Sequence, residues 1–533
     1  MNELPQPGKL KRLFATVKDA GTEWVRAKFG GATGEDAESE SGRLLHVGDG
    51  DFLTETNVFE GVQIFGATGS GKTSGSGQCL ALSLLEAGFG GLVLTAKPEE
   101  LKTWKEYLHH VSPSRLDDLC VLEPDGKYVF NFLAYEAEVA EREGINLTDN
   151  LVALFCTVME TAQRGGSQDA YWLRTLKQLL RNAIDLVLYA GEKLNFQNLH
   201  NLITSAPTHI SYVINKNDES CNQWREKSFC WQCGAAAFKR IPTSDRRNED
   251  LVITMRYWMN EFPNLAEETR SIIVSYFTSM ADCFLRGTLR DLFSPSETDK
   301  RPELRPDSTH KGKIIVLNLP VKEFNELGQF AQVLYKFVWQ RTTERRNPDA
   351  EGQVPVFLWA DEAQFFVTSH DMMFQTTARA KKAATVYLTQ NISNYYAILP
   401  GEKGRAETDS LLGNFQTKIF HTNGDSVTNV WAADLIGKNW NIRENHSSSV
   451  SNRDGSGTSQ FGISGAQTFE YQVIPMNFTI LTKGGRDNDL KVQAYLFHAG
   501  RKWASGENFK LVTFKQERIP ELPREVPAAN KQL

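Results

Sequence analysis

Residues 66–73 read GATGSGKT, and this stretch does most to decide the fold of the chain. It satisfies the phosphate-loop pattern G-x-x-x-x-G-K-[ST], which is meaningful between a strand and a helix. The strand-like run GVQIFGA (61–67) leads into it, and the helix-like run SGQCLALSLLEAG (76–88) follows. Glycines let the backbone wrap closely around phosphate, so that N–H groups and the helix N-terminus point at the anion. The sequence therefore predicts a nucleotide-binding loop rather than a Gly/Ser-rich turn that matches by chance.

Individual side chains of the loop have separate expected roles. Lys72 is expected to contact the β- and γ-phosphates, and the Thr73 hydroxyl is expected to ligate Mg²⁺. The expected phosphate-binding residues are Gly66, Ala67, Thr68, Gly69, Ser70, Gly71, Lys72, Thr73 and Ser74.

An acidic pair further along the chain completes the expected site. In VPVFLWADEAQ (354–364), an apolar run ends in Asp361 and Glu362. At the carboxyl end of a strand, Asp361 would bind the Mg²⁺ shell and Glu362 would orient or deprotonate the attacking water. Alone, the pair could merely cap a helix, but beside a full phosphate loop it predicts nucleotide hydrolysis. Its late position disfavours an adenylate- or guanylate-kinase, and the lack of Asn-Lys-x-Asp at the expected strand end favours ATP over GTP.

The composition is that of an ordinary globular protein. Of 533 residues, 41% are apolar and 23% are charged, which excludes a disordered, collagenous or low-complexity chain. The formal net charge of −6 gives no bulk signal for nucleic acid but leaves room for a local basic groove. The sequence has no apolar run of spanning length, no recognisable signal peptide and no cysteine pattern typical of a disulfide framework, so we expect a cytosolic protein.

The alternation of short apolar runs with longer amphipathic segments predicts the fold class. Runs that look like buried strands lie at 61–67, 90–96, 117–124, 311–320, 354–362, 382–390, 415–422 and 477–485. Strands of this kind, separated by helices, predict an α/β fold of the RecA-like P-loop type, with a mainly parallel sheet flanked by helices.

An all-helical insertion is expected to interrupt this α/β fold, because apolar residues recur at spacings of three and four between 145 and 300. The expected division is a basic amphipathic N-terminal segment (1–29), an acidic linker (30–42), a discontinuous ATPase domain (43–144 and 301–515), the insertion (145–300) and a C-terminal tail (516–533). The N-terminal segment could lie on an anionic membrane surface, dock on a partner or cover the main domain.

Two further stretches have a distinctive composition. Residues 445–468 are rich in Ser and Gly, which predicts a mobile loop. Cys221, Cys230 and Cys233 are close in sequence, and the last two have the C-x-x-C spacing of metal ligands. A fourth ligand is lacking nearby, with His209 the nearest candidate, so thiols within the helical insertion are favoured over a zinc site.

The ordered motifs resemble a known family. They run GATGSGKT, LTAKPEELKTW, a helical insertion, LWADEAQFF, ARAKKAATVYLTQNISNYY and LLGNFQTKIFHTNGD. In this order they are similar to the TraG/TraD-type conjugative coupling ATPases of type IV secretion, within the FtsK/HerA superfamily of ring-forming DNA motors. The resemblance covers roughly residues 43–500. It implies an ATP- and Mg²⁺-dependent hydrolase that forms a homo-oligomer, expected to be a hexamer, and translocates single- or double-stranded DNA.

The resemblance also suggests roles for residues after the acidic pair. Gln390 would sense the γ-phosphate, although it could be an ordinary polar residue at a strand end. Arg379 would be an arginine finger offered to the nucleotide of a neighbouring subunit, although it could be a solvated helix charge or a cation facing DNA. Lys381 and Lys382, and the Ser/Gly-rich stretch, are candidates for contacting DNA.

The chain also departs from the family pattern. Ala96 and Glu99 stand where members usually carry an acidic residue and a glycine. Many members have N-terminal transmembrane helices, which are not evident here, so contact with the inner face of the cell membrane would need residues 8–29 or a separate membrane protein. The implied partners are relaxase–DNA complexes and type IV secretion components. The alternatives are a HerA-like motor in repair or phage defence, and a nucleotide-gated recruitment module without transport.

Overall fold

A computed structural model describes residues 42–162, 170–215, 217–296, 298–399, 401–453 and 456–520. The predicted N-terminal segment, almost all of the acidic linker and most of the C-terminal tail lie outside these residues. Within the described part of the chain, no helix is both long and apolar enough to cross a membrane.

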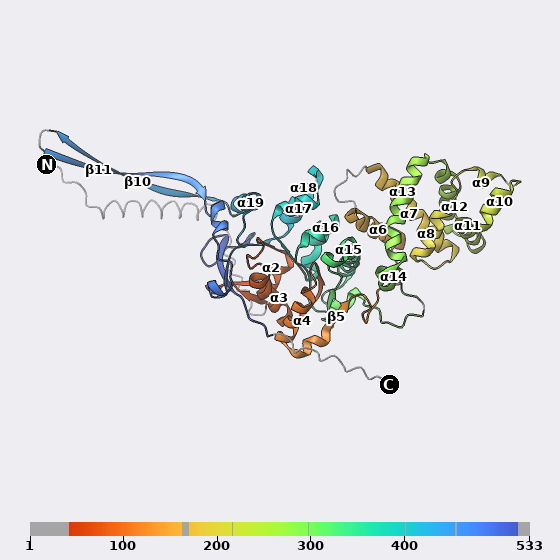
Figure 1. The fold of residues 1–533 in the computed structure, drawn as a ribbon, viewed down its shortest axis with the longest axis horizontal. Coiled ribbons are helices and arrows are strands. Elements are labelled where there is room, and N and C mark those ends of the chain that lie inside the picture. The colour runs from red at the N-terminus through yellow and green to blue at the C-terminus, as the bar shows by residue number, and fades with distance from the viewer. Residues whose placement is uncertain are drawn as a thin grey trace. The chain divides into compact units, whose positions relative to one another are not determined.

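A nine-stranded sheet forms the centre of the structure (Figure 1), in the order β13-β12-β9-β3-β8-β7-β4-β6-β5. Its strands are β3 (Val62–Phe65), β4 (Gly90–Leu94), β5 (Leu119–Leu122), β6 (Ile314–Leu317), β7 (Val356–Ala360), β8 (Ala383–Thr389), β9 (Thr417–Phe420), β12 (Lys491–His498) and β13 (Phe509–Lys515). The seven strands from β9 to β5 pair in parallel, whereas β12 pairs antiparallel with β9 and β13. The predicted α/β fold with a mainly parallel sheet is therefore confirmed.

The central strands are continuous apolar runs because helices cover both faces of the sheet. Successive residues of β4 show this: Leu92 and Leu94 belong to one buried cluster, and Val93 belongs to the other. The helices α3 (Gln78–Glu86) and α4 (Glu100–Val111) contribute to the cluster with Val93.

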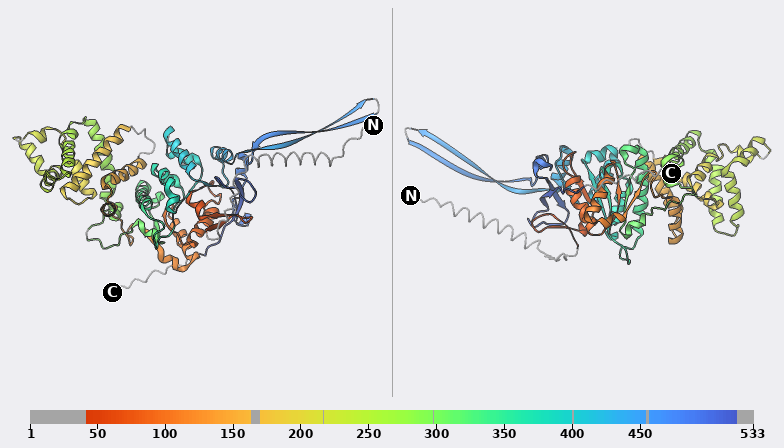
Figure 2. Two further views of the ribbon diagram at one scale, coloured as in Figure 1. Left: turned by 180° about the vertical axis from the view of Figure 1, so that it is seen from behind. Right: turned by 60° about the horizontal axis from the view of Figure 1, so that its bottom comes forward.

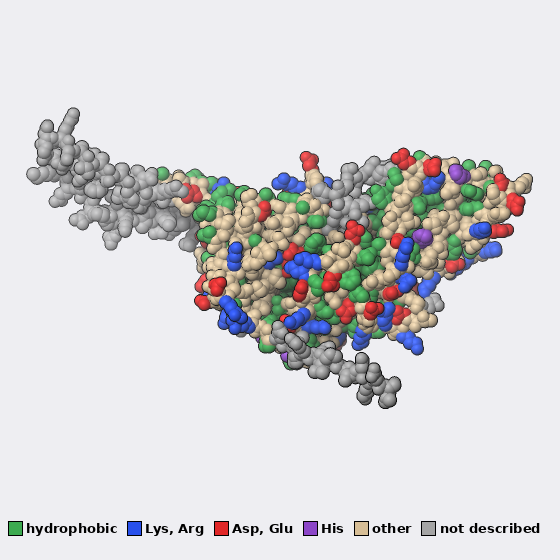
Figure 3. All heavy atoms as spheres, viewed as in Figure 1, with side chains coloured by type: hydrophobic (Ala, Val, Ile, Leu, Met, Phe, Trp, Pro, Cys, Tyr) green, Lys and Arg blue, Asp and Glu red, His purple; other side chains and the backbone are tan. Residues whose placement is uncertain are grey.

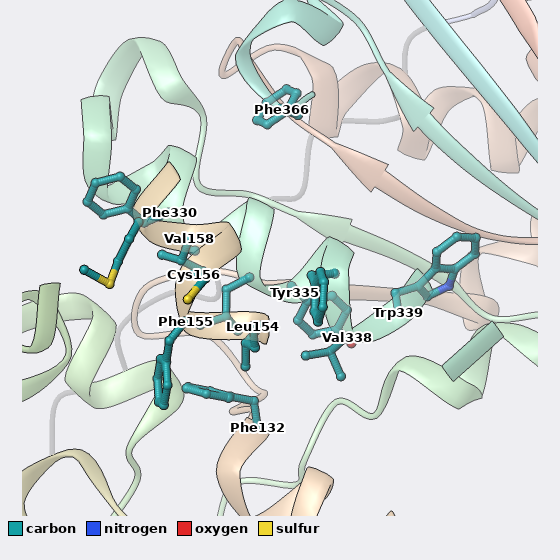
Figure 4. Packing of buried hydrophobic residues seen from close by; sticks show 14 of the residues in the cluster. Phe132, Leu154, Phe155, Cys156, Val158, Phe330, Tyr335, Val338, Trp339 and Phe366 are labelled. Atoms are coloured by element: carbon teal, nitrogen blue, oxygen red, sulfur yellow. The ribbon is translucent and has the colours of Figure 1, made fainter. Parts of the chain in front are cut away.

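The other face is covered by α15 (Val321–Arg345). The buried apolar cluster on this face continues into the helices between β5 and β6. Figure 4 shows Phe132, Phe155 and Leu154 beside Tyr335 and Val338 of α15. The connecting helices are α5 (Phe132–Glu143), α6 (Leu147–Ala162), α7 (Ala170–Ala190), α8 (Phe196–Thr204), α9 (Ser211–Ile214), α10 (Glu219–Lys227), α11 (Phe229–Arg240), α12 (Arg247–Arg256), α13 (Glu267–Leu285) and α14 (Gly287–Phe293). The helical character predicted for 145–300 is confirmed for the residues described in this range, whereas the division of the chain into domains stays a prediction.

The three clustered cysteines lie in this helical region. Cys230 and Cys233 are buried in α11, and burial raises the pKa of both thiols. The Cys221 thiol is close to the Ser211 carbonyl, at 3.4 Å. Among the described residues, no group of three His, Cys, Asp or Glu side chains is placed to hold a metal ion.

Two predictions about the C-terminal third are wrong. Residues 445–453 and 456–468 do not form a loop: they belong to β10 (Lys438–Arg453) and β11 (Ser456–Tyr471), an antiparallel hairpin that pairs with no other described strand (Figure 2). Residues 477–485 do not form a strand: Pro475 begins a 3₁₀ turn, η8 (Pro475–Thr479), and the segment pairs with β12 through an isolated bridge between Lys483 and Val492 and through hydrogen bonds between Thr482 and Gln493.

The remaining elements lie around the sheet. They are a small two-stranded sheet of β1 (Arg43–His46) and β2 (Phe52–Thr54), and the helices α2 (Glu55–Phe59), α16 (Ser369–Ala378), α17 (Ile392–Ile398), α18 (Gly401–Asn414) and α19 (Ser426–Ile436). Acidic and basic side chains are interspersed over the face seen in Figure 3, as the nearly balanced composition suggests.

Candidate nucleotide-binding site

The phosphate loop follows β3 at the carboxyl edge of the sheet. Its backbone is tied to the neighbouring strands, because Gly66 N–H donates to the Thr389 carbonyl and Ala67 N–H donates to the Thr422 carbonyl. Gly69 and Gly71 have φ angles of 72° and 84°, a backbone region that favours glycine. The loop then enters a single π-helical turn, η1 (Thr73–Gly77), that continues into α3. This strand–loop–helix arrangement is the one that the motif requires.

The acidic pair lies beside this loop. Asp361 and Glu362 directly follow β7, and both are buried. The Thr73 hydroxyl donates to Asp361 Oδ2 over 2.8 Å, and Lys72 Nζ lies 3.7 Å from both Asp361 Oδ1 and Glu362 Oε1. Four predicted residues, distant in sequence, therefore meet at one point.

Two glutamines fix the Glu362 carboxylate. Gln364 Nε2 donates to Oε2 over 3.0 Å, and the Gln364 side-chain carbonyl accepts from the Thr389 hydroxyl. Gln390 Nε2 lies 3.5 Å from Oε1, so this predicted residue joins the site. The Glu362 backbone has φ 53° and ψ 47°, a left-handed conformation that non-glycine residues rarely adopt and that is often found at functional sites.

The charge state of Glu362 follows from these neighbours. Burial alone would raise the pKa of this carboxyl, but the charge of Lys72 and the hydrogen bond from Gln364 act against it, with Lys97 and Gln390 adding to them. Together they hold the pKa of Glu362 below its usual range. The side chain is therefore a carboxylate at neutral pH, as a water-orienting base must be.

Arg379 is not part of this site. It begins the 3₁₀ turn η7 (Arg379–Lys381), which precedes the amino end of β8, at the opposite edge of the sheet from the phosphate loop. Its side chain is 65% exposed and pairs with Glu60 at 2.8 Å. Two neighbouring candidates for DNA contact are also engaged: Lys381 Nζ donates to the Arg346 carbonyl, and Lys382 Nζ donates to Asp349.

Sequence reasoning missed two charged residues of the site. Lys97 Nζ lies 3.6 Å from Glu362 Oε1 and 3.9 Å from Asp361 Oδ2. Glu100 accepts from the Ala96 N–H, and burial together with the charge of Asp361 raises its pKa to about 8. Both follow the end of β4, and that position was the available signal, because the carboxyl ends of parallel strands meet at one edge of the sheet.

A buried histidine supports the phosphate loop from behind. His421 Nε2 lies 2.6 Å from the Ser76 hydroxyl, and burial lowers the pKa of His421 to about 3. A Cβ at Gly66 would lie 2.9 Å from His421 Cβ and 2.4 Å from the Ser70 hydroxyl. Only glycine fits at position 66 without a shift of these neighbours.

The residues of the site fit a nucleotide with Mg²⁺. The Ser70 hydroxyl is buried and has no hydrogen-bond partner among the described residues, as expected of a group that faces a ligand. The Thr73 hydroxyl and the Asp361 carboxylate offer the oxygen ligands that Mg²⁺ prefers. Lys72 and Lys97 place two cations where phosphate charge would lie.

Comparisons with known proteins give matches in structure alone. No family model matches the sequence, and no curated protein matches it. The bacterial conjugative coupling protein TrwB, in an unbound form of TrwBdeltaN70, matches with a TM-score of 0.55 at 14% identity, covering 91% of this chain and 91% of that one. TrwB in complex with the non-hydrolysable ATP analogue ADPNP also gives 0.55 at 14% identity, covering 91% and 92% of the two chains. The chain thus has the fold of a TraG/TraD-type conjugative coupling protein.

Proposed function

We propose that this chain is an ATPase that couples Mg²⁺-dependent ATP hydrolysis to the transport of DNA in conjugative type IV secretion. The observation that carries the proposal is the meeting of Lys72, Thr73, Asp361, Glu362 and Gln390 at the carboxyl edge of the sheet. The buried, ionised Glu362 argues for hydrolysis, because a protein that only binds nucleotide needs no base beside the phosphate loop.

The side chains would act according to their charge and position. Loop N–H groups and Lys72 would bind the β- and γ-phosphates, while Thr73 and Asp361 would hold the metal. Bound Mg²⁺ would neutralise phosphate charge. Glu362 would orient the attacking water and accept its proton on a carboxylate oxygen that Gln364 keeps in place. Gln390 would turn from Glu362 to the γ-phosphate.

The position of Arg379 supports an assembly in which active sites are shared. Because this side chain lies at the amino edge, it could contact a nucleotide only on another copy of the chain. A guanidinium suits this role, since it is always charged and can bond two phosphate oxygens. A ring of six copies, as in the resembled family, is the proposed assembly.

The proposed partners follow from the conjugative setting. DNA, single- or double-stranded, would be the translocated substrate, and the helical insertion would recruit a relaxase–DNA complex. Type IV secretion components would dock the ring at the inner face of the membrane, either directly or through the N-terminal segment. The likeness in fold to a conjugative coupling protein supports this setting over repair or phage defence.

ATP turnover by the full chain, with and without single-stranded and duplex DNA, tests the proposal. We expect hydrolysis that at least one form of DNA stimulates several-fold. Absence of hydrolysis would contradict the ATPase, and hydrolysis indifferent to every DNA would favour a recruitment module. Lys72→Ala should abolish turnover. Lys403→Ala, at an exposed lysine that pairs with Glu407 on α18, is the matched control and should behave like the unmodified chain.

A further inference from the structure

A cavity of about 280 Å³ lies at the amino edge of the sheet, away from the nucleotide-binding site. It is open to solvent on one side and is lined by α5, by the 3₁₀ turn η5 (Pro306–Lys311), and by the end of α15 with the loop that leads to β7. Its place is fixed by the hydrogen bond from Val354 N–H, just before β7, to the His310 carbonyl. The volume is far more than one water requires and approaches that of small-molecule pockets.

The wall of this cavity carries an excess of positive charge. Four cations line it against two carboxylates: Arg142, Lys311, Arg345 and Arg346 against Glu143 and Asp307. Arg142 and Arg345 also pair with Glu138 and Glu136 just outside the lining, so the excess charge is that of Lys311 and Arg346. His310 adds no charge, because burial lowers its pKa to about 3. The cavity therefore favours an anion.

Arg346 is the least compensated of these cations. Its side chain is 7% exposed and donates to the carbonyl oxygens of Val354, Lys381 and Lys382, at distances from 2.5 to 3.0 Å. Among the described residues, no carboxylate lies within ion-pair distance of it, and burial lowers the pKa of Arg346 to about 10. A buried charge without a counter-charge is costly, so an anion in the cavity would stabilise it.

Two unsatisfied polar atoms indicate which anion fits. Arg345 approaches Glu136 and Glu143 with Nη2 and Nε, but its Nη1 is buried with no hydrogen-bond partner in the described part of the chain. Gln353 Oε1 is also buried and accepts no hydrogen bond from any described residue. A ligand that offers both an anionic oxygen and a hydrogen-bond donor would satisfy both atoms. A phosphate group that keeps one proton has both, whereas a carboxylate or a sulfate lacks the donor.

We propose that this cavity binds a small phosphate-bearing anion, with Arg345 donating to a phosphate oxygen and Gln353 accepting from its P–O–H group. The proposal does not depend on ATP hydrolysis. The bound anion would also lie beside Arg346, whose guanidinium holds the Lys381 carbonyl at the end of η7. The occupied cavity would thus strengthen the support of the turn that carries Arg379.

Inorganic phosphate, titrated at constant ionic strength into the full chain carrying Lys72→Ala, tests the proposal by calorimetry. The substitution weakens phosphate binding at the P-loop. We expect saturable binding, at least fivefold tighter than that of sulfate. Arg345→Gln should weaken phosphate binding at least tenfold, and Gln353→Leu should reduce the preference of phosphate over sulfate. Arg286→Gln, at an exposed arginine paired with Asp282, is the matched control and should change neither affinity.

The proposal would be overturned by no binding of phosphate, by equal affinity for phosphate and sulfate, or by an affinity that Arg345→Gln leaves unchanged. Displacement of phosphate by short DNA in an Arg345-dependent way would make nucleic acid the ligand and would also overturn it. If Arg345→Gln fails to fold, as judged by circular dichroism, Lys311→Gln replaces it at an exposed position of the wall. This variant should bind phosphate at least threefold more weakly, and an unchanged affinity would count equally against the cavity.

Discussion

Arg379 Nη1 lies 2.8 Å from Glu60 Oε1, and the two residues precede neighbouring parallel strands. Glu60 lies just before β3 and Arg379 before β8, so both are at the edge of the sheet opposite the phosphate loop. Glu60 Oε2 also lies 3.3 Å from His498 Nε2. The arginine is thereby held in a defined place from which its own nucleotide-binding site is out of reach.

A mixing experiment tests whether Arg379 acts on a neighbouring copy. Lys72→Ala and Arg379→Ala should each be inactive, the second with ATP binding intact, because an arginine finger contributes about 10³-fold or more to hydrolysis. When the two variants are mixed and reassembled, intact pairs of sites should form and turnover should rise about tenfold above either variant. Normal ATP turnover by Arg379→Ala would show that Arg379 is not an arginine finger. Inactivity that mixing does not relieve would contradict action between copies.

Lys97 is expected to lower the pKa of Glu362, the proposed base. Because the charge of Lys97 helps to hold the pKa of Glu362 below its usual range, Lys97→Met should raise that pKa. The acid limb of the kcat/KM profile should then move to higher pH, whereas Lys97→Arg should leave it in place. Lys102→Met, five residues further along the chain on α4 and paired with Glu106, is the control. A profile that does not move in Lys97→Met would show that Lys97 does not act on Glu362.

Buried histidines make the stability depend on pH. Burial lowers the pKa of His310 and His421 to about 3 and of His498 to about 4, while an unfolded chain has histidines near pKa 6.5. Their contribution is complete above about pH 6.5 and is lost as the pH falls towards the folded values, because the unfolded state then binds more protons.

The measurement is denaturant unfolding between pH 7 and pH 4.5. Each such histidine should contribute a fall of about 1.4 kcal/mol per pH unit below pH 6.5. His310→Gln should reduce the slope by about this amount, whereas His209→Gln, at an exposed position, should not change it. Equal slopes in the two variants would show that groups other than His310 cause the fall in unfolding free energy at low pH.

A buried ion pair supports the segment between the acidic pair and Arg379. Lys336 of α15 contacts Asp371 of α16, which also accepts from the Tyr387 hydroxyl and from Gln340. Lys336→Met should lower the free energy of unfolding by about 3–5 kcal/mol, because it leaves a buried carboxylate uncompensated. Lys336→Met with Asp371→Leu should recover part of this loss. A single variant as stable as the unmodified chain would show that Asp371 needs no counter-charge.

The sequence was most informative about site residues whose motifs lie at the carboxyl ends of parallel strands. Thr73, Asp361 and Gln390 could be grouped in advance because the carboxyl ends of β3, β7 and β8 meet at one edge. Lys97 was missed because it stands beside two departures from the family pattern, Ala96 and Glu99. The pairing of Arg379 with Glu60 could not be foreseen, since it depends on the register of two strands and on no motif.

The hairpin shows how composition misleads. Ser and Gly are typical of loops, so the composition of residues 445–468 predicted a loop. Arg453 pairs with Ser456, and the two residues between them in the sequence, Asp454 and Gly455, are a pair typical of two-residue hairpin turns. That dipeptide was the available signal. The absence of strong alternation between apolar and polar residues removed the usual evidence for strands.

The place of the helical insertion has a consequence for how such a chain can diversify. It joins β5 to β6, which are parallel neighbours, and β5 is the outermost strand of the sheet. Parallel neighbours always need a long connection across one face of the sheet. An enlarged connection at this end separates no other pair of strands. Evolution, or an engineer, could therefore exchange the helical module for another, while the strands that lead to Lys72 and Glu362 keep their register.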